Sequence, residues 1–105
     1  MKIHAKIAPL KNTIINTRRD FHKHPELSFK EFRTSKIVAE KLKNFGIETK
    51  KNIGKTGVVG ILKGEKNGPT IALRADMDAL PIQETNDLHY KSVNKGIMHA
   101  CGHDA

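Results

Sequence analysis

The sequence of 105 residues contains a single cysteine, Cys101, and no tryptophan. One cysteine cannot form an internal disulfide, and a chain without disulfides suits a reducing compartment, so we expect the protein in the cytoplasm. No apolar run is long enough to span a bilayer, and residues 1–12 lack the unbroken apolar core of a signal peptide. We therefore expect no membrane partner.

Acidic residues are also scarce, because 11 Asp and Glu stand against 19 Lys and Arg, which gives a net charge of +8. Such an excess suggests a nucleic-acid interaction. However, no block of five like charges occurs, and aromatic residues, which would stack on bases, make up only 5% of the chain. The lysines therefore fit solvated faces, and we expect no nucleic-acid partner. A basic, non-enzymatic interaction module is the alternative.

Two segments have the apolar spacing of amphipathic helices. Residues 3–23 carry apolar side chains on one face at helical spacing. Residues 29–45 repeat the pattern, and Ser28 with Glu31 matches a capping box at the start of this helix. Gly46 follows the last apolar position, where a left-handed C-cap is expected.

After residue 46 the period changes to that of strands. Short runs at 47–50 and 58–62 predict two strands, and a turn at 64–69 predicts a hairpin connection to a more deeply buried strand at 70–75. Residues 82–98 are polar and irregular, so a loop is expected there. Two helices followed by strands indicate an α/β fold in which two N-terminal helices pack on a mixed sheet.

Two aspartates, Asp76 and Asp78, directly follow the predicted strand 70–75. Ligands of open α/β sheets bind beyond the carboxyl ends of strands, and strand alternation places both aspartates on one side of the backbone. Such a pair could bind a metal or orient a ligating histidine. Aspartates in loops also commonly cap a following turn, so this structural role stays open.

The end of the sequence holds Cys101 and His103, separated by one glycine that lets the backbone aim both side chains at one point. A thiolate and an imidazole are good ligands for a transition metal such as zinc, with His99 or Asp104 assisting. The alternative is a buried thiol beside a surface histidine. Four or more ligands are usual, so the others must come from elsewhere in the chain, from a partner or from further sequence.

Three further ligand-type side chains, His22, His24 and Glu26, lie close together in the sequence. They could bind a metal. However, the C-terminal end of a helix favours histidine through its dipole, and we favour this structural role.

Four stretches resemble, in this order, the metal-dependent amidohydrolases: RRDFHKHPELSFKE, GVVGILKG, TIALRADMDALPI and HACGHD. That family includes hippurate hydrolase, N-acyl-amino-acid amidohydrolases and indole-acetyl-amino-acid hydrolases, and it shares a peptidase clan with carboxypeptidase G and aminoacylase. The resemblance covers residues 10–105, and four ordered motifs are far more specific than one.

The resemblance implies the N-terminal part of a zinc-peptidase-like catalytic domain with two divalent metal ions, manganese or zinc, per complete site. Cys101 and His103 would be metal ligands, and Asp78 would be the aspartate that supports the centre. Asp76 stands where many relatives have a ligating histidine. The implied reaction is hydrolysis of the amide bond of an N-acyl amino acid or peptide by metal-activated water, with a glutamate as general base.

The chain departs from this family in its length. Relatives are several times longer and carry paired glutamates, two further histidine ligands and a dimerisation or lid domain downstream. Neither Glu65 nor Glu84 lies in a motif that matches the general base. We therefore expect residues 1–105 to form a partial catalytic domain that is inactive alone, with a homodimer only in the full-length relative. A decayed remnant that folds poorly is a further alternative.

Overall fold

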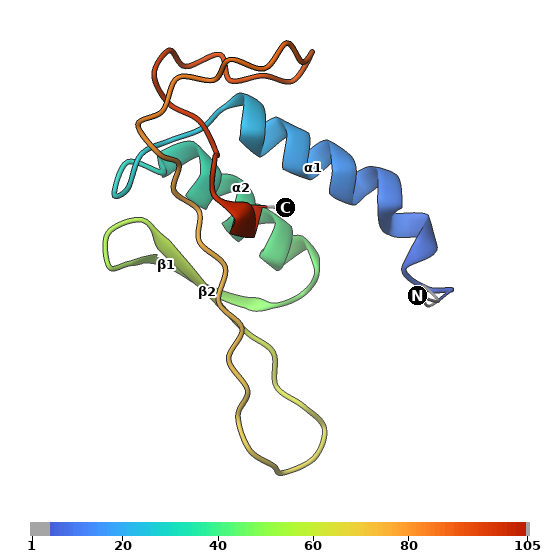
Figure 1. Cartoon of the computed structure of the whole chain (residues 1–105). Helices are drawn as coiled ribbons and strands as arrows, with labels where there is room; N and C mark the ends of the chain where they lie inside the picture. The colour runs from blue at the N-terminus through green and yellow to red at the C-terminus, as the bar shows by residue number, and fades with distance from the viewer. Residues whose placement is uncertain (1–4, 105) are drawn as a thin grey trace. The chain divides into compact units, whose positions relative to one another are not determined.

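The computed structural model describes residues 5–104, with the side chain of Asp104 left aside. The chain divides into two compact units, one comprising Met1–Pro25 and Ala79–Ala105 and the other comprising Glu26–Asp78. Figure 1 labels their helices and strands. Within residues 5–104, no helix has both the length and the apolar content that crossing a membrane requires.

The first unit contains helix α1, Lys11–Lys23, and the short 3-10 helix η1, Ala8–Leu10, leads into it (Figure 1). A proline sits in the first turn of η1, where a missing N–H is tolerated. The backbone N–H of His24 closes α1 by donating to the carbonyls of Asp20 and Phe21, at 3.2 Å and 3.1 Å. The predicted helix is thus confirmed up to residue 23 but begins later than expected. Its first two predicted residues, 3 and 4, lie outside the described residues.

The rest of the described first unit, residues 79–104, has little regular structure. Leu80 and Met98 form an isolated antiparallel bridge, in which each N–H donates to the other residue's carbonyl, at 2.9 Å and 3.0 Å. The predicted loop over 82–98 is confirmed, except that Met98 pairs with Leu80. The 3-10 helix η2, Gly102–Asp104, follows.

The second unit contains helix α2, Phe32–Asn44, whose C-terminal end is as predicted. Gly46 adopts a φ of 75°, and its N–H donates to the carbonyl of Lys43 over 2.9 Å. The N–H of Ile47 donates to the carbonyl of Leu42 over 3.0 Å. These two bonds are the Schellman pattern, which satisfies carbonyls that the helix leaves without partners and needs a residue that tolerates positive φ.

The N-terminal end of α2 differs from the prediction, because the capping box at Ser28 and Glu31 is wrong. The carboxylate of Glu26 instead accepts the N–H groups of Arg33 and Thr34 in the first helical turn, at 2.9 Å and 2.7 Å. Ser28 and Glu31 have the right local spacing, but both find partners distant in the sequence. The helix consequently begins at Phe32 and not at residue 29.

The sheet of the second unit is an antiparallel hairpin of β1, Glu48–Ile53, and β2, Gly57–Ile61. The pairing aligns Glu48 with Ile61 and shifts register between Lys50 and Ile53. The hairpin packs on α2, and Gly60 allows the close approach, since a Cβ there would lie 3.3 Å from a methyl carbon of Leu42. The two strands predicted around 47–50 and 58–62 are therefore confirmed in outline, as is the α/β class.

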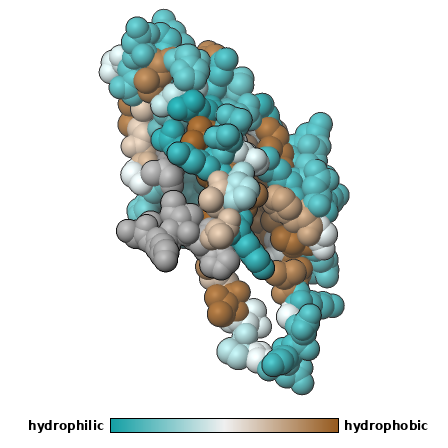
Figure 2. Space-filling view, turned by 90° about the vertical axis from the view of Figure 1, so that its right-hand side faces the viewer, coloured by the Kyte–Doolittle hydropathy of each residue, from teal (hydrophilic) through white to brown (hydrophobic). Residues whose placement is uncertain are grey.

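The third predicted strand, 70–75, does not form in the described part of the chain, so the expected mixed sheet is a two-stranded antiparallel one. Ile71 and Leu73 are 83% and 96% exposed, although the apolar sequence predicts burial. Among the described residues, the buried apolar side chains are those of Ala39, Ala79 and Pro25. Figure 2 shows other apolar side chains, in brown, lying open between polar ones on the face it presents.

Candidate functional site

The predicted ligand pair Cys101 and His103 lies in the first unit, where η2 turns the backbone at Gly102. The Sγ atom of Cys101 and the Nδ1 atom of His103 are 3.5 Å apart, and both residues are exposed. The exposure of Cys101 rules out the alternative of a buried thiol. The thiol and the imidazole therefore converge, as the spacing predicts, although Gly102 between them has no positive φ and a Cβ there would meet no atom within 4 Å.

The distance between these two atoms can be compared with the separation of two ligand atoms bound to one metal ion. A tetrahedral cation, at about 2.3 Å from sulfur and about 2.0 Å from nitrogen, holds its two ligand atoms about 3.5 Å apart. The distance in the structure matches this value, and it also suits a hydrogen bond from the thiol to Nδ1. The pair thus fits two of the ligand positions around a cation such as zinc.

Two ligands do not complete a metal site. Across residues 5–104, no three His, Cys, Asp or Glu side chains gather into a group that could hold a cation. His99, which was expected to assist, is half-buried and does not join Cys101 and His103 in such a group. The side chain of Asp104, also expected to assist, lies outside the described part.

Asp78 lies in the second unit, where it is half-buried and held by a serine. The Oγ atom of Ser28 donates to Oδ2 of Asp78 over 2.5 Å. Asp76 points its Oδ1 atom at the guanidinium group of Arg74, at 2.8 Å from Nη2. The two aspartates thus have different partners, because a hydroxyl orients Asp78 and a cation neutralises Asp76.

Asp76 and Asp78 both line a hollow of about 380 Å³ within the second unit. Glu31 and Thr56 also line it, and the buried Glu31 accepts a hydrogen bond of 2.6 Å from the hydroxyl of Thr56. The other lining residues come from the 28–31 turn, the β1–β2 connection and the extended segment 74–78. The hollow therefore combines carboxylates, hydroxyls and one arginine.

The side chains of His24 and Glu26 have structural partners. The Nδ1 atom of His24 lies 2.9 Å from the carbonyl oxygen of Asp20, within the last turn of α1. Glu26 caps the first turn of α2 and accepts from the hydroxyl of Thr34 over 2.7 Å. These contacts agree with the structural role that we favoured over metal binding.

His22 is buried and belongs to a polar cluster that the sequence did not predict. Its Nε2 atom lies 2.9 Å from Oε1 of Glu84, whose other oxygen accepts the backbone N–H of Ser92 at 2.6 Å. Burial by itself raises the pKa of Glu84, but hydrogen bonds from Ser92, His22 and Asn86 and the electrostatic attraction of His22 outweigh burial and hold the pKa below its usual value. Glu84 is therefore a carboxylate at neutral pH and only accepts hydrogen bonds, so Nε2 of His22 carries the proton.

Aromatic contacts enclose this cluster. The ring of Tyr90 meets the ring of His22 edge-on, with centroids 5.8 Å apart, and the guanidinium carbon of Arg19 lies 4.7 Å from the centre of the Tyr90 ring. The signal in the sequence for Glu84 is weak, since one glutamate in a polar loop is ordinarily solvated. Only the position of the loop 84–94 against α1 shows that Glu84 is buried.

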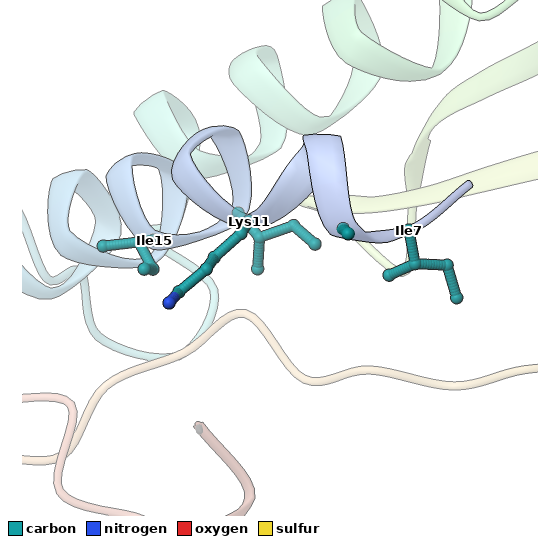
Figure 3. Close-up of a pocket in the computed structure, with 5 residues that line it drawn as sticks. Ile7, Lys11 and Ile15 are labelled. Atoms are coloured by element: carbon teal, nitrogen blue, oxygen red, sulfur yellow. The ribbon is translucent and has the colours of Figure 1, made fainter. Parts of the chain in front are cut away.

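A second hollow, of about 420 Å³, lies on the first unit along η1 and α1 (Figure 3). The described residues that line it are Ile7, Ala8, Lys11, Ile14 and Ile15. Apart from the amine of Lys11, these five described side chains are apolar, and none of them carries a carboxylate, thiol or imidazole. They therefore do not offer the groups that acid–base or metal chemistry requires.

Comparison with known proteins identifies relatives of this chain. A family model described as peptidase family M20/M25/M40 matches residues 72–105. Thermostable carboxypeptidase 2 of Saccharolobus solfataricus is 53% identical over 98% of this chain and 26% of its own length. Hippurate hydrolase of Campylobacter jejuni is 51% identical over 99% of this chain and 27% of its own length.

A solved structure extends the likeness to the fold. A dinuclear metal binding peptidase of the M20 family from Bacillus subtilis matches with a TM-score of 0.85 and 49% identity, over 92% of this chain and 28% of that chain. The fold thus corresponds to the N-terminal part of the catalytic domain of such enzymes. The chain spans about a quarter of the length of the relatives it matches. Residues 72–105 therefore match peptidase family M20/M25/M40, and nearly the whole chain is similar to about a quarter of a carboxypeptidase, a hippurate hydrolase and a dinuclear metal binding peptidase.

Proposed function

We propose that this chain supplies one part of a metal-dependent hydrolase that cleaves the amide bond of small N-acyl amino acids or peptides. The observation that carries the proposal is the 3.5 Å distance between Sγ of Cys101 and Nδ1 of His103, which is the separation of two ligands on one tetrahedral cation. The names of relatives, among them hippurate hydrolase and N-acyl-L-amino acid amidohydrolase, support the substrate class.

In this proposal, Cys101 as a thiolate and His103 as a neutral imidazole bind a divalent cation, two of which are present per complete site. When bound, the cations supply Lewis-acid chemistry for amide hydrolysis. Asp78 supports the centre, and the hydroxyl of Ser28 fixes the orientation of its carboxylate through the 2.5 Å hydrogen bond. Zinc suits the thiolate ligand well, and manganese is the alternative.

The described residues offer fewer than the usual four ligands, so we propose that hydrolysis requires further ligands and a general base from additional polypeptide. A thiolate ligand must stay reduced, which suits the cytoplasm. The substrate is a small molecule, and the proposal involves neither nucleic acid nor a membrane.

Cobalt(II) binding tests the ligand assignment, because a cobalt–thiolate bond absorbs in the near ultraviolet. We expect this absorption on adding Co²⁺ to the 105-residue chain and its loss in the Cys101→Ser and His103→Ala variants. His89→Ala is the matched control, since His89 is an exposed histidine that contacts the ring of Tyr90. Equal spectra for the wild type and Cys101→Ser would refute the proposal.

Hydrolysis is tested by mixing the chain with a separately expressed polypeptide that covers the remaining three quarters of the Campylobacter jejuni hippurate hydrolase. We expect release of amino acid from an N-acyl substrate in the mixture with zinc or manganese, and none from either part alone. Turnover by the 105-residue chain alone would contradict the need for further ligands.

A further inference from the structure

One buried carboxylate ties the loop 84–94 to the C-terminal end of α1. Glu84 is the first residue of this loop, and its Oε1 atom accepts a hydrogen bond of 2.9 Å from the Nε2–H group of His22. Its Oε2 atom accepts the N–H of Ser92, near the other end of the loop, over 2.6 Å. The side chains of His22 and Glu84 are only 7% and 2% exposed. A single carboxylate therefore closes the loop on itself and against the helix.

Two further bonds fasten the end of the loop to the residues that end and follow α1. The N–H of Val93 donates to the carbonyl of Lys23 over 2.9 Å, and Nδ2 of Asn94 donates to the carbonyl of Pro25 over 2.8 Å. Four residues after Asn94, Met98 forms the bridge with Leu80. The loop is thus held at both ends by α1 and by the bridge, immediately before the segment 99–103.

The chemistry of the pair indicates a purpose other than stability. A buried ion pair loses so much hydration that replacement of both partners by apolar side chains is often neutral for stability. The hydrogen bonds of such a pair are directional, however. Two apolar side chains can pack against each other in several registers, whereas a carboxylate that accepts from three donors fits in one register only. Glu84 receives donors from His22, Asn86 and Ser92, so its position is fixed from three directions.

We propose that His22 and Glu84 are positioning residues for the segment that carries Cys101 and His103. They fix the register of the loop 84–94. The loop in turn fixes the pairing of Met98 with Leu80 and the positions of the Cys101 thiol and the His103 imidazole. The proposal rests on the proposed function for the role of that segment in binding a metal. The role of the pair is thus to fix the position of this segment, and not to stabilise the fold.

The experiment replaces both partners together, as His22→Leu with Glu84→Leu in the 105-residue chain. Three quantities are measured: the thermal midpoint by circular dichroism, the amide exchange rate of Met98 by NMR, and the Co²⁺ concentration that half-saturates the thiolate absorption. We expect an unchanged midpoint, with exchange at Met98 and half-saturating Co²⁺ both raised about tenfold, the effect of losing a charged hydrogen bond. Unchanged exchange at Met98 in the double variant would overturn the proposal.

If the double variant does not fold, a matched pair of single variants tests the proposal instead. His22→Gln keeps an N–H donor for Glu84, whereas His22→Met has a similar length without a donor. We expect slower exchange at Met98 in His22→Gln than in His22→Met, and equal rates would overturn the proposal. A wild-type chain without cobalt–thiolate absorption refutes the proposed metal ligation, and exchange at Met98 then decides the positioning role alone.

Discussion

Thr34 donates both its backbone N–H and its hydroxyl to the same oxygen of Glu26, Oε1, each over 2.7 Å. The other oxygen of Glu26 accepts the N–H of Arg33. A carboxylate thus stands at the N-terminal end of α2, where the first N–H groups lack partners within the helix and the dipole favours negative charge. Glu26 lies six residues before the helix, so this cap comes from outside the usual capping position.

Replacing this cap predicts a local loss of stability. Glu26→Ala leaves three donors without an acceptor, and we expect it to destabilise α2 by about 1–2 kcal/mol, as loss of a strong N-cap does. Amide exchange along α2 measures the change. Glu40→Ala, which removes an exposed glutamate from the same helix, is the control and should stay within about 0.5 kcal/mol of the wild type. Equal effects of the two substitutions would contradict the capping role.

We expect acid to lower the stability of the first unit because it protonates Glu84. Its folded pKa lies below the ordinary value of 4.5, so the unfolded chain binds more protons between the two values. The stabilisation is complete above the unfolded pKa and is lost as pH falls through the folded pKa. We therefore expect the free energy of unfolding of the wild type to drop faster below pH 4.5 than that of Glu84→Gln.

Circular dichroism at a series of pH values measures this difference between wild type and variant. Glu65→Gln removes an exposed carboxylate instead and controls for the change in net charge. The advantage of the wild type over Glu84→Gln should shrink as the pH is lowered from 6 to 3. A constant difference over this range would show that Glu84 does not titrate with folding.

The sequence predicts elements whose signals are local. The apolar period of α2 and the glycine after it are read within one helix, and Gly46 does take a positive φ. The capping box failed because Ser28 and Glu31 match the motif locally but bond to Asp78 and Thr56, which lie 50 and 25 residues away. A local motif cannot reveal such competition from distant partners.

The candidate site likewise contains one contact between neighbours in the sequence and one between distant residues. Cys101 and His103 are two residues apart, so their convergence is a local feature that the sequence spacing can predict. His22 and Glu84 are 62 residues apart, and nothing near either residue indicates the other. The apolar segment 70–75 shows the opposite failure, since its composition predicts a buried strand but the segment pairs with neither β1 nor β2.

The positive φ of Gly46 predicts a penalty for any side chain there. A Cβ meets no atom within 4 Å, so the effect of Gly46→Ala isolates the backbone conformation from packing. We expect a loss of about 1–2 kcal/mol, the price of a left-handed conformation for a residue with a Cβ. Gly68→Ala is the control, because that glycine is equally uncrowded but has no positive φ. Amide exchange in α2 compares the two, and similar effects would contradict the explanation.

The small buried core predicts that the free energy of unfolding depends only weakly on the concentration of urea. Among the described residues, the buried apolar side chains are those of Pro25, Ala39 and Ala79, so little apolar surface is available to be exposed on unfolding. Because the urea m-value scales with the surface exposed on unfolding, we expect a value at or below about 1 kcal/mol/M, the low end for small proteins. Adding the polypeptide that covers the remaining three quarters of a relative should steepen the transition by burying Ile71 and Leu73, which now lie in solvent. Unfolding of the chain alone that is as steep as that of a compact domain of equal length would contradict this account of its core.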